Sequence, residues 1–170
     1  MKNFARLAVL AVAATVTAAP AFAQSASVPA GSEPVGRARI IKPLALEAVS
    51  DMNFGDITVE DAGVATVNAA TGLVSCTGGL TCPGGSSAAT WKVRGTNNQT
   101  VNITKPASVT LDHETTSDTL TLNIVGQDTL LLSSSGMTGT DFSLGGNISV
   151  PASARAGLYE GTIVVTVQYP

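Results

Sequence analysis

The sequence has few charged residues, and the 12 acidic residues outnumber the nine basic ones. Asp, Glu, Lys and Arg make up 12% of its 170 residues, well below the ~25% that is usual for soluble proteins. The nine Lys and Arg residues are scattered along the chain and form no cluster. Proteins that bind nucleic acid need grouped basic side chains to neutralise phosphates. We therefore expect no nucleic-acid partner, and a surface made largely of Ser, Thr, Asn and Gly.

Residues that commonly carry catalysis or bind metals are also scarce. There is one histidine, His113 in LDHETTSD, and no serine stands in a G-x-S-x-G or comparable motif. The sequence also lacks the phosphate-binding loop and the D-x-D-x-D-G calcium loop. We expect His113 to be an exposed loop residue, and the protein to be no enzyme and to need no cofactor. A calcium site stays an alternative, built either from Asp51 and Asp56 or from Asp112, Glu114 and Asp118, although acidic turn residues explain these carboxylates equally well.

Cysteine is limited to Cys76 and Cys82, both in the glycine-rich stretch SCTGGLTCPGGSS. In an exported protein, two cysteines most simply form one disulfide. The C-x5-C spacing is not that of a redox motif, and the single histidine lies far away in sequence. We predict a disulfide that shapes the tip of a hairpin without holding the core together.

Long apolar runs are rare as well, and the clearest one lies at the N-terminus. It covers residues 7–19, follows Lys2 and Arg6, and precedes a small-residue site that ends at Ala23. A run of this length falls short of the ~20 residues that span a bilayer. The layout is that of a secretory signal peptide. We expect residues 1–23 to be removed, and the mature chain to be exported with no transmembrane segment.

The remaining sequence is rich in Thr, Val, Ser and Gly, a composition that favours strands over helices. Short alternating segments are separated by turn signals. In AATWKVRG the apolar face is Trp91 and Val93, and in QTVNITKP it is Val101 and Ile103. A turn is expected at residues 70–72. Eight to ten such segments indicate an all-β fold of the sandwich type.

The C-terminal stretch LYEGTIVVTVQYP ends this pattern with residues of high β propensity. Residues 162–169 alternate, so that Ile163, Val165, Val167 and Tyr169 fall on one side of the strand. A strand with such a face needs neighbours to bury it. One candidate neighbour is a strand from another copy of the protein.

The mature N-terminus has a different character. Residues 24–36, QSASVPAGSEPVG, contain two prolines, two glycines and no bulky apolar side chain except valine. We expect an extended arm there, followed by one β domain over residues 37–170. The first segment of that domain, RARIIKPLALEA, contains Pro43, whose missing N–H favours an edge strand or a switch between sheets.

Three stretches together resemble the DUF4402 family of exported bacterial proteins: ARIIKPLALEAVSDMNFGDITV, AATWKVRGTNNQTVNITKPASVTL and ISVPASARAGLYEGTIVVTVQYP. That family is similar in its ends to the spore-coat-U-like pilins of archaic chaperone-usher systems. The resemblance covers nearly all of the mature chain. It implies an incomplete immunoglobulin-like β-sandwich, which a periplasmic chaperone completes first and a donor strand from another subunit completes in the fibre.

The resemblance also implies roles for particular residues. The donor strand would lie in the arm, and its apolar side chains are Ala26, Val28, Ala30 and Val35. The acceptor groove would be lined from both ends of the domain, by Ile40, Leu44, Leu46, Ile163, Val165, Val167 and Tyr169.

The function that follows is that of a structural subunit of a bacterial surface fibre, a pilus or fimbria assembled by donor-strand exchange. The expected partners are copies of the same chain, a periplasmic chaperone and an outer-membrane usher. The expected location is the cell surface, reached through the periplasm. A monomeric secreted or surface-bound binding module, for example one for carbohydrate, is the alternative. Such a module would close its sheet within the chain and would display aromatic side chains for stacking on sugars.

Overall fold

The computed structural model describes residues 31–32, 34–134 and 138–170. The chain divides into two units, Met1–Ala38 and Arg39–Pro170. In the first unit, the described residues form neither strand nor helix and are exposed, with Val35 at 68%. Three of the four predicted donor residues, Ala26, Val28 and Ala30, lie outside the described residues.

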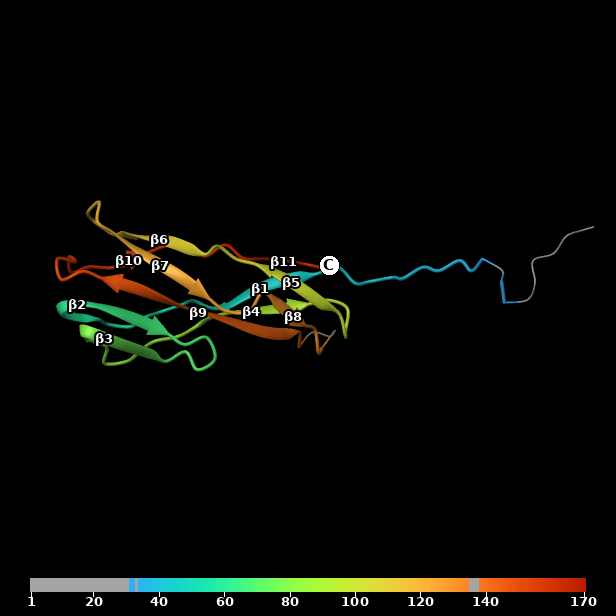
Figure 1. The fold of residues 1–170 in the computed structure, drawn as a ribbon, viewed down its shortest axis with the longest axis horizontal. Helices are drawn as coiled ribbons and strands as arrows, with labels where there is room; N and C mark the ends of the chain where they lie inside the picture. Colours follow the sequence, from blue (N-terminus) through green and yellow to red (C-terminus); the bar gives the residue numbers. More distant parts are fainter. Residues whose placement is uncertain (1–30, 33, 135–137) are drawn as a thin grey trace, which may run out of the picture. The chain divides into compact units, whose positions relative to one another are not determined.

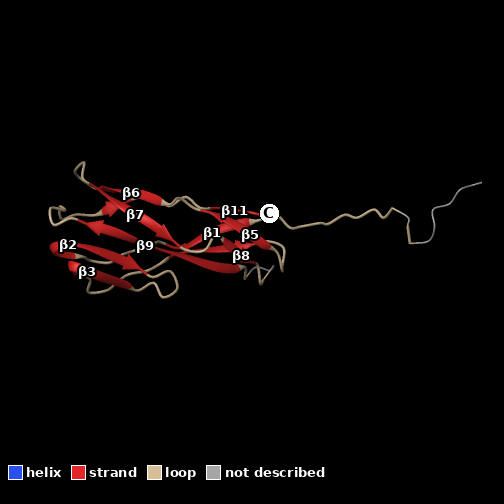
Figure 2. Ribbon diagram, in the orientation of Figure 1, coloured by secondary structure: helices blue, strands red, loops and turns tan. Residues whose placement is uncertain are grey.

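The second unit is built from antiparallel strands, and no helix occurs in the described part of the chain (Figure 2). No helix able to cross a membrane is therefore found there. The strands are β1 (Ala45–Ser50), β2 (Thr58–Val67), β3 (Val74–Thr81), β4 (Ala89–Arg94), β5 (Thr100–Thr104), β6 (Ser108–His113), β7 (Thr119–Val125), β8 (Thr129–Leu131), β9 (Thr140–Val150), β10 (Tyr159–Glu160) and β11 (Thr166–Gln168).

The larger sheet has the order β1-β4-β9-β7-β6-β10, with β2 joined to β9 and β3 to β2 (Figure 1). Strand β9 organises it, because its two halves have different neighbours. Residues 140–144 of β9 pair with β4, whereas residues 145–150 lie between β7 and β2. The sheet therefore curls into an open half-barrel. The smaller sheet has the order β11-β5-β8.

The end of the chain runs along both sheets. Tyr159 of β10 lies opposite His113 of β6, and further on Thr166 of β11 lies opposite Thr104 of β5. Strands β5 and β6 follow each other in sequence, so the C-terminal segment is antiparallel first to one and then to the other. Between the two pairings, residues 161–165 belong to no strand.

The core lies inside the curled sheet and follows the alternation of each strand. In β7, for example, Leu120, Leu122 and Ile124 are buried while the residues between them are exposed. Trp91 and Phe142, from paired positions on β4 and β9, stack with their ring centroids 5.5 Å apart. The all-β prediction is confirmed, although the described residues form eleven strands where eight to ten were expected. The predicted turn at residues 70–72 is also confirmed, and it joins β2 to β3.

The disulfide between Cys76 and Cys82 is confirmed, but its predicted position at a hairpin tip is wrong. Cys76 lies within β3, opposite Ala65 of β2. Its Cα atom is 6.0 Å from that of Cys82, whereas six residues of straight strand would span ~20 Å. Strand β3 therefore bends sharply between its cysteines, at Gly78, where φ is +71°. The glycines that indicated a turn instead allow a bend in a strand that continues to pair, and the disulfide braces this bend.

Candidate functional site

The C-terminal segment is paired on one side at β10 and β11, and residues 161–165 between these strands belong to no strand. Strand β10 pairs with β6 and β11 with β5, and within the described residues neither has a second partner. Its side chains alternate as the sequence predicted: Ile163, Val165, Val167 and Tyr169 are half-buried against the core, and Val164 on the other face is 66% exposed. The segment thus offers an apolar face and a row of backbone groups without a strand beside them.

A second edge of this kind lies at the start of the domain. Strand β1 pairs with β4 alone among the described residues. Leu44 and Leu46 are half-buried against the same core as the C-terminal segment. Ala48, which follows them in the alternation, is exposed. The structure does not bring Ile40 into this set, because its side chain is 94% exposed and precedes β1.

We call these half-buried apolar side chains the open seam. It consists of Leu44, Leu46, Ile163, Val165, Val167 and Tyr169. Its two edges belong to different sheets, and no strand pairing joins them. Six of the seven predicted acceptor residues thus lie on unpaired edges and pack on one core, half-covered.

Tyr169 links the two edges at one end of the seam. Its hydroxyl donates a hydrogen bond to the carbonyl oxygen of Lys42 at 2.9 Å and accepts one from the backbone N–H of Thr96 at 2.8 Å. Lys42 lies just before β1, and Thr96 lies in the turn between β4 and β5. One side chain of the last strand therefore connects three segments that are distant in sequence.

A cavity of about 470 Å³ lies where the chain leaves β1 and where it approaches β10. Residues 53–57 and Val59 form one wall, and residues 154–159 form the other. Its floor is the apolar surface of the larger sheet, made by Leu111, Leu120, Ile148 and Val150. The cavity was not predicted, because these segments come together only in the folded domain.

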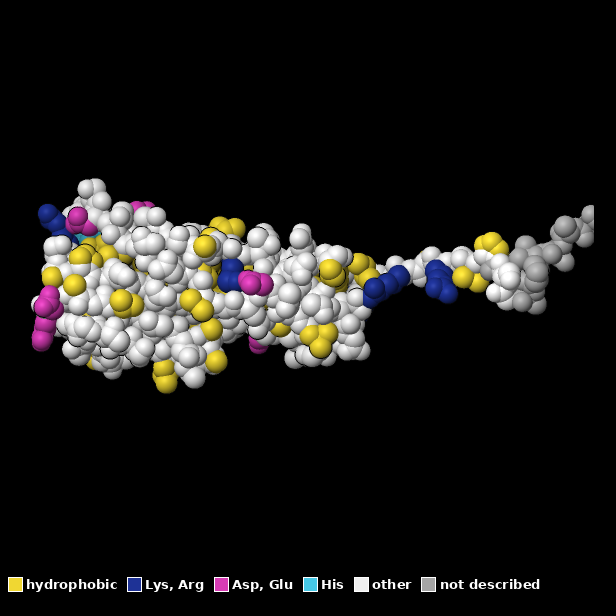
Figure 3. All heavy atoms as spheres, in the orientation of Figure 1, with side chains coloured by type: hydrophobic (Ala, Val, Ile, Leu, Met, Phe, Trp, Pro, Cys, Tyr) yellow, Lys and Arg dark blue, Asp and Glu magenta, His cyan; other side chains and the backbone are white. Residues whose placement is uncertain are grey.

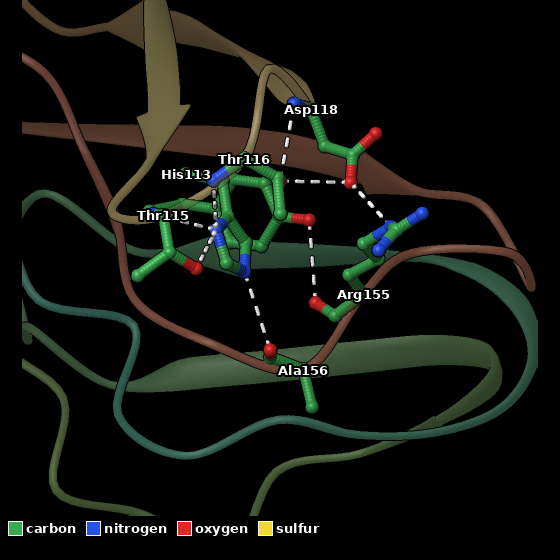
Figure 4. Close-up of polar contacts among 7 residues, drawn as sticks. His113, Thr115, Thr116, Asp118, Arg155 and Ala156 are labelled. Carbon is green, nitrogen blue, oxygen red and sulfur yellow. Dashed lines mark hydrogen bonds and ion pairs between the residues drawn. The ribbon is translucent and has the colours of Figure 1, made fainter.

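His113 helps to hold the second of these walls (Figure 4). The expectation of an exposed loop residue is wrong, since His113 ends β6 and is only 7% exposed. Its Nδ1 atom accepts hydrogen bonds from the backbone N–H groups of Thr115 and Thr116, at 3.1 and 3.2 Å. Nε2 is then the protonated nitrogen, and it donates to the carbonyl oxygen of Ala156 at 3.2 Å. The edge of one ring meets the face of the other where His113 contacts Tyr159, with centroids 4.8 Å apart.

An ion pair supports the same wall. The Nε atom of Arg155 lies 2.9 Å from a carboxylate oxygen of Asp118, which also accepts a hydrogen bond from the Thr116 hydroxyl. Asp118 is one of the carboxylates considered for calcium. In the described ranges, no group of three or more His, Cys, Asp or Glu side chains is arranged to hold a metal ion.

The site is consequently apolar rather than ionic. Figure 3 shows few acidic or basic side chains on the visible face of the domain. The chemistry available at the seam is the burial of apolar side chains and the pairing of backbone N–H and C=O groups. Both are what an added β-strand would require.

Comparison with known proteins gives the family of the chain but no named relative. No curated protein matches the sequence, and no solved structure matches it either. The family model described as domain of unknown function DUF4402 matches residues 44–169. This range begins at the first residue of the open seam and ends at the last, and it covers most of the chain. The chain therefore belongs to the DUF4402 family.

Proposed function

We propose that the protein is a structural subunit of a bacterial surface fibre, in which the N-terminal arm of one copy adds a strand to the open seam of another. The observation that carries this proposal is the C-terminal segment: an alternating apolar face that is only half-buried, beside a backbone edge without a partner. The resemblance of the chain's ends to those of chaperone-usher pilins supports the same assignment.

Physical chemistry favours filling such a seam. An added strand would cover the exposed parts of six apolar side chains, each contributing ~25 cal/mol per Å² of surface removed from water. It would also pair backbone groups that otherwise present an edge open to aggregation. Residues 161–169 extend over ~27 Å as a strand, so an arm of thirteen residues, 24–36, is long enough to cover them.

Export of the chain sets conditions on how such a fibre would assemble. The predicted signal peptide at residues 1–23 would direct the chain to an oxidising compartment, and the Cys76–Cys82 disulfide supports this proposal. A subunit with an open seam needs protection before it meets the next copy. We therefore propose a periplasmic chaperone and an outer-membrane usher as partners, and the cell surface as the final location.

Two adjacent valines provide a matched test. Val165 faces the seam, whereas Val164 is 66% exposed on the opposite face. Val165→Asp places a charge where the added strand would bury it without a partner, which is costly. Expressed with its chaperone and usher, this variant should form no fibres by electron microscopy, and Val164→Asp should form them. Equal fibre yield from the two variants would contradict the proposal.

Deletion of the arm tests the donor. A mature chain that lacks residues 24–36 keeps the open seam but has no strand to give. Mixed with the full chain, it should cap growing fibres and shorten them in proportion to its concentration. If the truncated protein polymerises as well as the full chain, the donor strand lies elsewhere.

The cavity supports one other function, that of a binding module for a small apolar ligand. Its floor is apolar and its volume of about 470 Å³ lies in the range of small-molecule sites. Stacking on sugars is not supported, since no aromatic side chain in the described residues is exposed. A gel run without boiling separates the two functions. Strand-exchanged polymers should survive as a ladder, whereas a binding module should run as a monomer.

A further inference from the structure

The cavity wall formed by residues 154–159 has little strand structure of its own. Between the end of β9 and the start of β10, residues 151–158 belong to no strand. Apart from one internal turn, the hydrogen bonds that hold these residues come largely from the β6–β7 turn. The backbone N–H of Glu114 donates to the Leu158 carbonyl at 2.9 Å, and His113 donates to Ala156 at 3.2 Å.

His113 connects this wall to the sheet in a way that an apolar side chain could not. It is the one buried polar side chain among the described residues, at 7% exposed, and both of its ring nitrogens have partners. Burying a polar ring costs free energy unless all its hydrogen bonds are made. A Leu or Phe at this position would fill the space without that requirement. What the imidazole adds is a directed link from the turn at residues 115–116 to the Ala156 carbonyl.

The backbone near His113 leaves room for its imidazole ring. Gly157 has φ of +153°, and a side chain on it would collide with the His113 ring. The chain can therefore pass directly over the imidazole. Tyr159, which begins β10, also packs against His113. The ring thus fixes both the middle of the wall and the start of the C-terminal edge.

We propose that His113 is a positioning residue: it holds residues 154–159 at the distance from residues 53–57 that keeps the cavity between these two walls open to an incoming strand. The consequence for strand binding rests on the proposed function, but the consequence for the wall does not. Loss of the link should let the wall move while the rest of the sheet stays folded, because local segments open independently of the core.

Two substitutions distinguish the hydrogen bonds made at Nδ1 of His113 from the one made at Nε2. His113→Asn places an amide oxygen where Nδ1 lies, so it can still accept from the turn, but it is too short to reach Ala156. His113→Gln places an amide nitrogen where Nε2 lies, so it keeps the bond to Ala156. Thr90→Val is the stability control, since it removes a hydrogen bond of 2.9 Å to Ser143 on the outer face of β4 and β9.

The experiment measures hydrogen exchange of residues 152–160 and the binding of a labelled peptide with the sequence of residues 24–36, both on the mature chain. His113→Asn should speed exchange in this segment and weaken peptide binding by about tenfold each, as expected for one lost hydrogen bond. His113→Gln should restore much of both, and Thr90→Val should change neither, although it also loses a hydrogen bond between side chains.

The two measurements distinguish failure of the His113 role from failure of the proposed function. Unchanged exchange at residues 152–160 in His113→Asn would overturn the role of His113, whatever the peptide does. Faster exchange with unchanged peptide binding would show that the wall does not control the seam, and would equally overturn it. If the wild-type chain itself fails to bind the peptide, the proposed function fails, and the exchange data alone then decide whether His113 positions the wall.

Discussion

Strand β7 and the C-terminal segment have the same sequence pattern but are buried to different degrees. In β7, the inward residues Leu120, Leu122 and Ile124 are 9%, 2% and 8% exposed. In the C-terminal segment, the inward residues from Ile163 to Tyr169 are half-buried. The difference lies in the neighbours, because β7 has β6 on one side and β9 on the other, whereas the C-terminal strands are paired on one side. Alternation thus determines which face is apolar, and the neighbouring strands determine how completely it is covered.

The largest expected effect comes from supplying the C-terminal segment with a strand on its unpaired side, so that it has two neighbours as β7 has. We expect a chain with residues 24–36 appended after Pro170 through a flexible linker to gain about 5 kcal/mol in the free energy of unfolding, if ~200 Å² of apolar surface becomes covered. Urea denaturation measures the change. The control carries Val28→Asp in the appended copy, and it should gain much less. Equal midpoints for the two fusions would mean that the seam does not take up this strand.

A pair of isoleucines compares the two regions directly. Ile124→Ala in β7 should cost about 4 kcal/mol, because it leaves a cavity among fully buried side chains. Ile163→Ala in the seam should cost about 1.5 kcal/mol, since its side chain is only partly buried. Chemical denaturation of the two variants tests this difference. In the fused chain, the cost of Ile163→Ala should rise toward that of Ile124→Ala, and a cost that stays the same would contradict the covering of the seam.

Removal of the disulfide tests a part of the larger sheet that lies outside the seam. Replacing Cys76 and Cys82 together with Ser should lower stability by about 2 kcal/mol on the chain-entropy model for so short a loop. The fold should persist, because the core does not depend on the bond. Thermal unfolding under non-reducing conditions measures the loss. A double variant that fails to fold would show that the bend in β3 cannot form without its brace.

The smallest effect is expected at Tyr169. Tyr169→Phe keeps the ring but removes the bonds to Lys42 and Thr96, at a cost of about 1 kcal/mol in the free energy of unfolding. Denaturant titration against the wild-type chain provides the measurement, with Tyr159→Phe as the control for loss of a tyrosine hydroxyl. A larger loss at Tyr159 than at Tyr169 would contradict the bridging role.

The sequence predicted those features that depend on alternation within one segment. It identified β4, β5 and the apolar side of the C-terminal segment, because each is decided by a period of two. The parity rule could also have found His113, since Val109, Leu111 and His113 occupy alternate positions of SVTLDH. The prediction of an exposed His113 rested instead on the lack of a catalytic motif around it.

Other features depend on contacts between distant segments. The cavity joins residues 53–59 to residues 154–159 over a floor from three strands, and no single stretch carries its signature. The bend at Gly78 was read as a turn because glycine serves both purposes, and the register of β2 and β3 decides between them. The break between β10 and β11 arises because β10 pairs with β6 in the larger sheet and β11 pairs with β5 in the smaller sheet. The sequence of the C-terminal segment alone does not show this change of partner.

The bridge at Tyr169 also has a mechanical meaning. Its hydroxyl joins the end of β11 to Lys42, which lies between the N-terminal arm and β1. In the proposed fibre, tension leaves a subunit through its own arm and arrives through the strand held in its seam. Both ends of this load path meet near one side chain. Pulling forces would then pass along one margin of the domain, and the central strands β7 and β9 would carry little of the strain.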